Sequence, residues 1–392
     1  MAREQRKAII QSLQQERGGR LLITYITSTR PNHEVQIADD AFRIIFDHLE
    51  AGKEAAKSGV DLFIHSNGGS GTVPWRIVNL IRQYTEHFAV LVPNHAFSAA
   101  TLIALGADEI IMHRMGCLGP IDPSVANVFN PPHPGNPGQP APISVEDVTA
   151  FFKMVKEEIG ITHEDELIQA LIALTEKIHP LALGNVQRSH SQSRLMARKL
   201  LRLHLGESEE HTIETLIDNL KSNLFFHGHP INREEARRDL KLPITNPSEP
   251  LERLMWDLYK EYETELRLME PFNPLREFDL QNKGQNPQQS LTAADIIKQM
   301  MELSKAGIGL GAVSEKQLVN LAANMVPFIS GGVAPNRKLR LDPVIGACVE
   351  SIAHVDVFKT DVTIEQVSLA TPSGPQDAIK QEVIWQRWEK EQ

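Results

Sequence analysis

Two short apolar segments, each followed at once by small residues that open a helix, constrain the fold of this chain more than any other feature. The first, residues 62–65, leads into Ser66-Asn-Gly-Gly-Ser70, and the second, residues 89–92, leads to Asn94-His-Ala-Phe-Ser98-Ala-Ala. A helix is expected between them, over about 73–85. Strands that alternate with helices pair in parallel through right-handed crossovers. Both strands therefore end at the same edge of one sheet, where ligand sites of such sheets lie.

These two strand ends carry groups that acyl-transfer chemistry needs. Glycine turns and helix starts leave backbone N–H groups unpaired, and such groups stabilise a developing oxyanion when they point to one spot. Gly68 and Gly69 form the turn, and Ser98 stands where the next helix starts, so Ser98 is a candidate nucleophile. The serine is not in a Gly-x-Ser-x-Gly segment, which excludes the nucleophile elbow of α/β-hydrolases. Glycine turns are common, so only the combination of both strand ends makes this interpretation specific.

The remaining part of the first 244 residues continues the alternation of strands and helices. The expected strands lie at 21–28 and 109–112, and the expected helices at 37–52, 99–105, 144–159, 164–205 and 211–224. Residues 130–142 are rich in proline, which lacks a backbone donor and fixes φ, so we expect a surface loop or lid there. The fold class is therefore α/β, with parallel strands and crossover helices.

The character of the sequence changes beyond residue 244. Helices are expected at 250–269, 293–305 and 315–325, and two strands at 353–359 and 362–367. We therefore divide the chain into an α/β domain, residues 1–244, and a mainly helical extension, residues 245–392, that ends in a short strand pair. The extension carries no catalytic motif and is expected to serve oligomerisation or packing onto the core.

Composition argues against several classes of function. The net charge of −10 and a pI of about 5.9 disfavour a surface for nucleic acid or anionic membranes, although residues 194–202 form a local basic run. The chain has two cysteines, and no segment approaches the roughly 20 apolar residues of a membrane span. We therefore expect no nucleic-acid partner, no disulfide, no integral membrane segment and a cytoplasmic location.

Three motifs in order resemble those of the serine dehydrogenase proteinase family. They are Ile64-His-Ser-Asn-Gly-Gly-Ser70, the run from Val92 to Met112 around Ser98, and Gly116-Cys-Leu-Gly-Pro-Ile-Asp-Pro123. That family belongs with signal peptide peptidase A and the Clp-type peptidases in the ClpP/crotonase fold, and the resemblance covers about residues 18–240. It implies that Ser98 is the nucleophile and that the backbone amides of Gly68 or Gly69 and of Ala99 form the oxyanion hole.

The general base is less well defined by this resemblance. Clp-type peptidases use a histidine in the segment that here reads 116–123, and this segment contains none. The membrane-associated relatives use a Ser-Lys dyad, which implies Lys153, on a helix whose apolar neighbours are expected to bury the amine and make it a base. Lys156 on the same helix and His190 are the alternative bases, and imidazole titrates near neutral pH.

We therefore expect an ATP-independent serine peptidase with a Ser-Lys dyad, which hydrolyses peptides or unfolded proteins and forms a homo-oligomer. No cofactor and no metal are expected, because His227 and His229 have no third ligand near them in the sequence. Two alternatives stay open. In the first, the fold is retained as an inactive scaffold or binding protein. The missing histidine favours this alternative, as does Asn67, a position at which relatives usually have proline. In the second, the oxyanion hole serves crotonase-like acyl-thioester chemistry.

Overall fold

The computed structural model describes residues 2–121, 124–133, 136–205, 209–220, 229–277, 338–371 and 374–391. The chain forms two compact units. The first consists of Met1–Glu270, Ile345–Phe358 and Trp388–Gln392, and the second of Pro271–Val344 and Lys359–Arg387. The predicted domain boundary between residues 244 and 245 stays a prediction. The first compact unit continues past this boundary to Glu270 and includes two segments from the C-terminal part of the chain.

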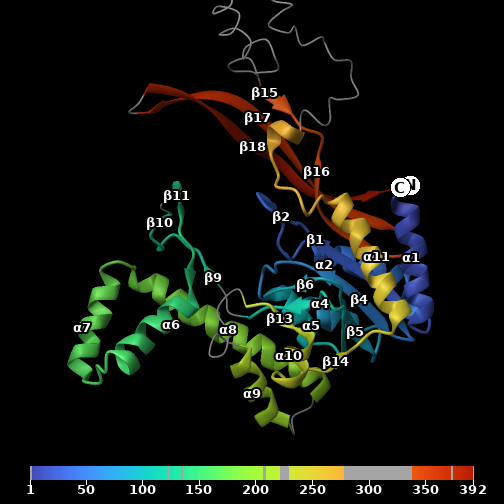
Figure 1. The fold of residues 1–392 in the computed structure, drawn as a ribbon, viewed down its shortest axis with the longest axis horizontal. Coiled ribbons are helices and arrows are strands. Elements are labelled where there is room, and N and C mark those ends of the chain that lie inside the picture. Colours follow the sequence, from blue (N-terminus) through green and yellow to red (C-terminus); the bar gives the residue numbers. More distant parts are fainter. Residues whose placement is uncertain are drawn as a thin grey trace, which may run out of the picture. The chain divides into compact units, whose positions relative to one another are not determined.

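A largely parallel sheet forms the centre of the first unit (Figure 1). Its order is β14 (Ile244–Thr245), β7 (Glu109–Met112), β5 (Phe88–Val92), β4 (Val60–His65), β1 (Leu21–Thr27) and β16 (Val344–Glu350), of which only β16 runs antiparallel to its neighbour β1. All residues of β1, β4 and β5 are buried, as expected for parallel strands covered on both faces. This arrangement confirms the predicted α/β fold class.

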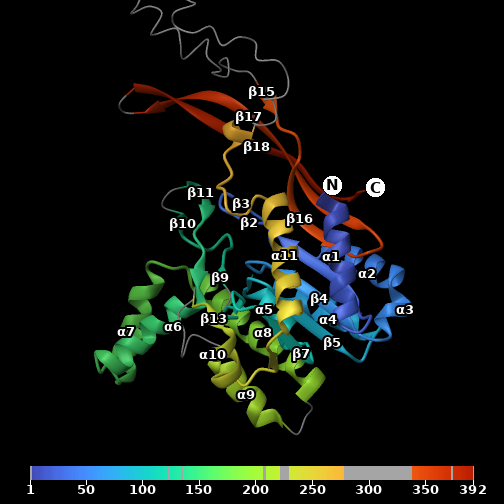
Figure 2. The same ribbon diagram turned by 45° about the vertical axis from the view of Figure 1, so that its right-hand side comes forward.

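Helices cover both faces of the sheet because alternate strand residues point to opposite sides. Leu21 and Ile23 face a core that includes α2 (Ala41–Ala51), α4 (Val73–Arg82), α5 (Ala99–Leu105) and the second half of α8 (Pro180–Leu205). Leu22 and Ile26 face a second core with α1 (Ala2–Glu16) and α11 (Glu249–Glu265). Figures 1 and 2 show α1 and α11 side by side on this face. Helix α11 therefore belongs to the core of the first unit.

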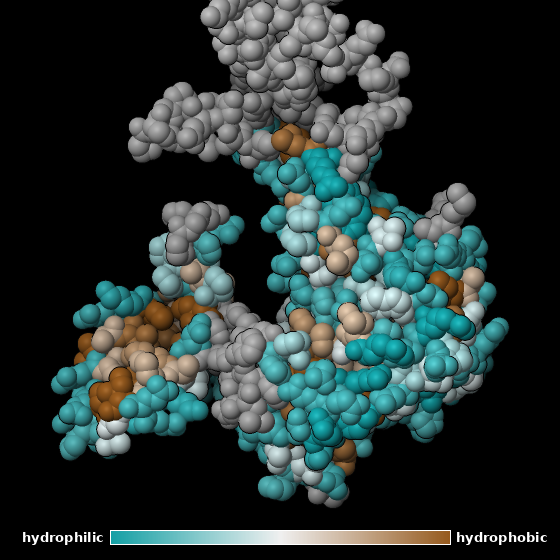
Figure 3. Space-filling model, in the orientation of Figure 1, coloured by the Kyte–Doolittle hydropathy of each residue, from teal (hydrophilic) through white to brown (hydrophobic). Residues whose placement is uncertain are grey.

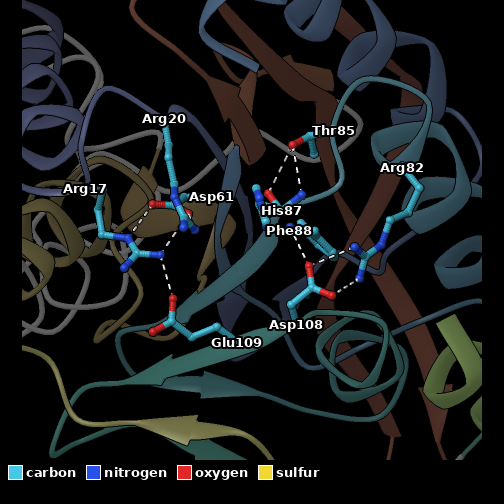
Figure 4. A network of polar contacts seen from close by, with 9 residues as sticks. All are labelled: Arg17, Arg20, Asp61, Arg82, Thr85, His87, Phe88, Asp108 and Glu109. Atoms are coloured by element: carbon cyan, nitrogen blue, oxygen red, sulfur yellow. Dashed lines mark hydrogen bonds and ion pairs between the residues drawn. The ribbon is translucent and has the colours of Figure 1, made fainter. Parts of the chain in front are cut away.

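A network of polar contacts fixes the amino ends of the central strands (Figure 4). Arg17 donates to the buried carboxylate of Asp61 at 2.7 Å and to Glu109 at 2.8 Å. The carboxylate of Asp108 accepts the first amide N–H of β5 at 2.8 Å and is paired with Arg82. These bonds satisfy polar groups that burial would otherwise leave unpaired. Because Asp61 and Glu109 lie near the first residues of β4 and β7, the network occupies the edge opposite to the carboxyl ends of these strands.

Short elements connect the main strands and helices of the first unit. Three short strands pair in the order β13 (Ile231–Asn232), β8 (Cys117–Leu118) and β6 (His95–Ala96). Two further pairs are β2 (Thr29–Arg30) with β3 (His33–Glu34), and β9 (Ser124–Val125) with β12 (Ile143–Ser144). Short helices are α3 (Lys53–Ala56) and α10 (Arg233–Arg238). The proline-rich segment contains an antiparallel pair, β10 (Pro132–His133) with β11 (Asn136–Pro140). Both residues of β10 are exposed, so proline there costs no inner-sheet hydrogen bond.

The predicted helical region 144–205 consists of several helices. They are α6 (Val145–Lys153), which widens into the π-helix η1 (Met154–Glu158), then α7 (Glu164–Thr175) and α8. Helix α6 packs through Val148 on Ala182 and Val186 of α8, a small cluster separate from the main core. The basic run 194–202 on α8 forms ion pairs with acidic side chains of α9 (Glu210–Asn219), which are Glu210, Glu214 and Asp218. The three arginines of this run are thus paired with carboxylates of the same chain.

The predicted strands 353–359 and 362–367 form one continuous strand, β17 (Val355–Thr371), which pairs with β18 (Gly374–Glu391). In the second unit β17 also pairs antiparallel with β15 (Lys338–Arg340), where Leu339 lies opposite Ile364. A small apolar cluster of this unit contains Phe272, Leu341, Val362 and Ile364. The helices predicted at 293–305 and 315–325 lie outside the described residues.

Candidate active site

Ser98 lies at the turn between β6 and α5, with φ 51° and ψ −111°. Residues other than glycine rarely adopt positive φ, and such strain is maintained only where the surrounding structure enforces it. The side chain is partly exposed and makes no capping hydrogen bond to α5. The turn therefore presents a hydroxyl whose hydrogen-bonding capacity is not used by the helix that it precedes.

The glycine turn packs directly against this serine. Gly68 has φ 101°, and a Cβ atom at this position would lie 2.7 Å from both the Phe97 carbonyl oxygen and the Ser98 Cβ atom, and 3.1 Å from the Ala99 nitrogen. Only glycine fits this contact without displacing the backbone. The structure thus brings together the two motifs that the sequence places 30 positions apart (98 − 68).

The three amides predicted for an oxyanion hole differ in their hydrogen bonds. The Gly68 N–H donates to Ser66 Oγ at 3.0 Å, and that oxygen also accepts from Thr27 Oγ1 at 2.7 Å. The N–H groups of Gly69 and Ala99 make no hydrogen bond within the described part of the chain. Gly69 and Ala99 therefore keep donors that an oxyanion can use, while the Gly68 amide is already engaged.

Ile37 holds the glycine turn from its other side. Its N–H donates to the Gly68 carbonyl at 2.8 Å, and its carbonyl accepts from the Ser70 N–H at 2.9 Å. A Cβ atom at Gly69 would lie 2.3 Å from the Ile37 oxygen, so this position also requires glycine. The role of Ile37 could not be predicted from the sequence, because only its apolar side chain is visible there. Ser66 could have been identified, because a serine before Asn-Gly-Gly is a typical turn residue.

The third sequence motif supports the strand that carries Ser98. Strand β8 pairs with β6, and Thr101 Oγ1 of α5 lies 2.8 Å from the Ala96 carbonyl oxygen and 2.9 Å from the Gly119 oxygen. A Cβ atom at Gly119 would lie 2.9 Å from the ring of Phe97. The described part of this motif therefore fixes the turn at Ser98, whereas Asp122 and Pro123 lie outside the described residues.

A cavity of about 650 Å³ opens in front of Ser98. Its wall combines the glycine turn, the segment after β3, and one face of α8. The lining residues are Glu34, Val35, Gln36, Asn67, Gly68, Gly69, Ser70, Gly71, Thr72, Ser98, Leu102, Ile121, Ser189, Gln192 and Ser193. Eight of these fifteen residues are glycines or carry a hydroxyl group.

The three candidate bases are not among the residues that line this cavity. Lys153, the last residue of α6, is exposed, although the sequence analysis expects its apolar neighbours to bury it. The reason is that α6 packs through Val148 on α8, while Phe151 and Phe152 stack edge to face on each other at 5.3 Å. Lys156 is also exposed, and His190 is half-buried next to the lining residue Ser189. The identity of the base stays a prediction.

Two histidines lie near the carboxyl ends of the strands, of which His65 is buried and His95 is partly buried. His65, the last residue of β4, and His95 of β6 lie with ring centroids 4.2 Å apart, and His65 Nε2 is 3.2 Å from Thr29 Oγ1. Burial lowers the pKa of His95 to about 4 and places the pKa of His65 well below its usual value. Both rings are therefore neutral at neutral pH, and neither lines the cavity.

Similarity to known proteins agrees with this geometry. Residues 3–158 match the family of ClpP-like SDH-type serine proteinases. Two relatives from Methanocaldococcus jannaschii are similar. Uncharacterized protein MJ0137 is 30% identical over 203 residues, which cover 52% of this chain and 59% of the relative, and uncharacterized protein MJ1495 is 38% identical over 66 residues, which cover 17% and 23%.

The chain thus spans less than two thirds of either relative. Within the described residues no helix combines the length and the apolar character that a membrane crossing requires. The family match contains the glycine turn, Ser98 and the helix that ends at Lys153. Residues 3–158 of this chain are thus similar to the ClpP-like SDH-type serine proteinase family.

Proposed function

We propose that the protein is a serine peptidase in which Ser98 attacks the carbonyl carbon of a peptide bond. A bond forms between Ser98 Oγ and the carbonyl carbon, the C–N bond breaks, and the base passes the serine proton to the leaving amine. The N–H groups of Gly69 and Ala99 stabilise the oxyanion. The observation that supports this function best is the strained backbone of Ser98, enforced by the contact with Gly68.

We also propose that Lys153 is the base and that a neighbouring copy of the chain supplies it. Helix α7, close behind Lys153 in the chain, has no buried residue, and Ile168, Leu171 and Ile172 are between 42% and 53% exposed. Figure 3 shows apolar surface over α6 and α7. Exposed apolar patches typically mark protein interfaces, and a homo-oligomer would cover this one. Burial at such an interface disfavours the charged ammonium, as a lysine base requires.

Complementation between inactive variants tests this arrangement. Ser98→Ala and Lys153→Ala are each expected to lose casein cleavage without added ATP, while Lys156→Ala, a matched change of an exposed lysine, keeps most of it. Dissociating and reassembling a mixture of the two inactive variants should restore cleavage, because mixed oligomers contain sites with both residues intact. An inactive mixture would place the base within the same chain. Full activity of Lys153→Ala would exclude the dyad.

Labelling with a serine-directed phosphonate tests the nucleophile itself. Wild-type protein should gain the mass of one label per chain, and Ser98→Ala should gain none. An unlabelled wild type would favour the alternative function, a binding scaffold of the same fold. The specific observation behind that alternative is that none of the three candidate bases lines the cavity.

A cytoplasmic location remains part of the proposal, supported by the two unpaired thiols of Cys117 and Cys348.

A further inference from the structure

His48, His354 and Asp356 form a buried group that does not line the cavity of the proposed active site. His48 lies in the last turn of α2 and is 0% exposed. His354 immediately precedes β17 and Asp356 lies in it, with exposures of 7% and 6%. Two positions apart along an extended strand, their side chains point to the same face. The first unit thus brings two imidazoles and one carboxylate to one place.

The distances within this group match a metal coordination shell. His48 Nε2 lies 3.2 Å and His354 Nε2 3.3 Å from Asp356 Oδ2, and the three atoms all lie within 4.8 Å of one another. Ligands about 2.0–2.1 Å from a tetrahedral zinc ion are about 3.3 Å from each other. The two ligand-to-ligand distances to the carboxylate oxygen are therefore those that one shared ion would produce.

Hydrogen bonding leaves the same three atoms unsatisfied. His48 Nε2, His354 Nε2 and Asp356 Oδ2 are buried and have no hydrogen-bond partner among the described residues. Buried polar atoms without a partner are rare, and an ion is one of the few explanations for three that face each other. The other nitrogen of His48, Nδ1, lies 2.8 Å from Ser351 Oγ. A donated Nδ1–H at that contact leaves Nε2 unprotonated, as in histidines that bind metals through this atom. The His48 and His354 rings are stacked, with their centroids 3.8 Å apart.

We propose that His48, His354 and Asp356 bind a divalent transition-metal ion, with Zn²⁺ as the best match. Two imidazole nitrogens and one carboxylate oxygen form a donor set that zinc accepts, and a water molecule completes the fourth position. The ion joins α2 to the start of β17 within the first unit.

No sequence motif announces this site, because its ligands come from elements far apart in the chain. His48 and His354, for example, are separated by 306 positions (354 − 48). The role of the ion is structural in this proposal, and it does not depend on peptidase activity. A metal-binding test can therefore fail or succeed regardless of whether Ser98 is a nucleophile.

Metal content and thermal unfolding of the full chain test the proposal. After removal of metals with a chelator and reloading with ZnCl₂, gel-filtered wild-type protein should retain one zinc per chain and melt at a higher temperature than the metal-free protein. His354→Gln and Asp356→Asn should lose both the zinc and the zinc-dependent shift. His95→Gln, a change of another largely buried histidine without a carboxylate partner, should retain them. Ser351→Ala, which releases the His48 ring and removes the acceptor of the Ala353 N–H, should weaken zinc binding by about 10- to 100-fold.

Cobalt keeps the test decisive if the ligand variants do not fold. Co²⁺ bound to wild-type protein should give the intense visible absorption of a four-coordinate ion, which zinc then abolishes. The proposal is overturned if wild-type protein retains no zinc and melts at the same temperature with and without chelator. It is equally overturned if folded His354→Gln retains as much zinc as the wild type.

Discussion

Replacement of Gly68 by alanine tests whether the contact between the glycine turn and Ser98 shapes the site. The new methyl group would lie 2.7 Å from the Phe97 oxygen and from the Ser98 Cβ atom, closer than real Cβ contacts allow. Neither neighbour is the end of a flexible side chain, so the turn itself has to move. The φ angle of 101° adds backbone strain for any residue with a Cβ atom.

Two terms set the size of this effect. A strained backbone costs about 1–3 kcal/mol, and forcing an extra methyl group into a packed site costs about 1–3 kcal/mol more. We therefore expect Gly68→Ala to lose about 2–6 kcal/mol of unfolding free energy, a large part of the roughly 5–15 kcal/mol of a typical domain. Because the turn moves away from Ser98, labelling by the phosphonate should slow as well.

Urea unfolding followed by tryptophan fluorescence measures the first effect, and intact-mass labelling measures the second. Gly71→Ala is the matched control in the same turn, because a Cβ atom there meets nothing within 4 Å and its φ is not positive. We expect the control to stay within about 0.5 kcal/mol of the wild type. If Gly68→Ala unfolded at the wild-type urea concentration and labelled at the wild-type rate, the close contact would not shape the site.

Three further outcomes are expected. Arg17→Met leaves the buried carboxylate of Asp61 without its closest partner and should cost about 3–5 kcal/mol in urea unfolding, whereas Arg43→Met, which breaks an exposed helical pair, should cost less than about 0.5 kcal/mol. Replacing residues 131–141 by a short Gly-Ser linker should change peptide cleavage and hardly alter the melting temperature; a large loss of stability would make this segment structural. The unfolding free energy should fall as the pH drops from about 6.5 to about 4, because histidines of the unfolded chain bind protons in this range while the His95 ring of the folded chain stays neutral. With a pKa of about 4 for His95, this residue accounts for up to about 3 kcal/mol of the loss in unfolding free energy. His95→Gln should show a shallower fall, and an unchanged pH profile would contradict this assignment.

The glycine turn and Ser98 could be predicted because their signals are local. An apolar strand that runs into Gly68 and Gly69, and another that leads to Ser98, each specify a strand, a tight turn and a helix within about 15 residues. Parallel crossovers then leave little choice about where the two turns meet. Sequence patterns of this kind determine both the fold class and the nucleophile candidate.

Contacts between distant segments could not be predicted in this way. Thr24 of β1 lies opposite Glu350 of β16, and their pairing depends on which strand edge remains open once the parallel strands have formed. The same holds for α11, whose apolar face fits any uncovered sheet face, and for Ile37, whose backbone holds the glycine turn. Ligand groups assembled from such segments, including His48 with Asp356, leave no spacing pattern in the sequence.

The position of Lys153 leads to a last expectation about how activity depends on assembly. Lys153 is exposed and does not line the cavity in front of Ser98, so a single copy of the chain should be nearly inactive. If a second copy supplies Lys153, specific activity should fall on dilution as the oligomer dissociates, and Ile172→Glu on the exposed face of α7 should move this fall to higher protein concentration. Thr175→Glu, a charge of the same sign at the end of the same helix, is the control for charge alone. Specific activity that stayed constant down to concentrations at which gel filtration shows only single chains would mean that each chain carries its own base.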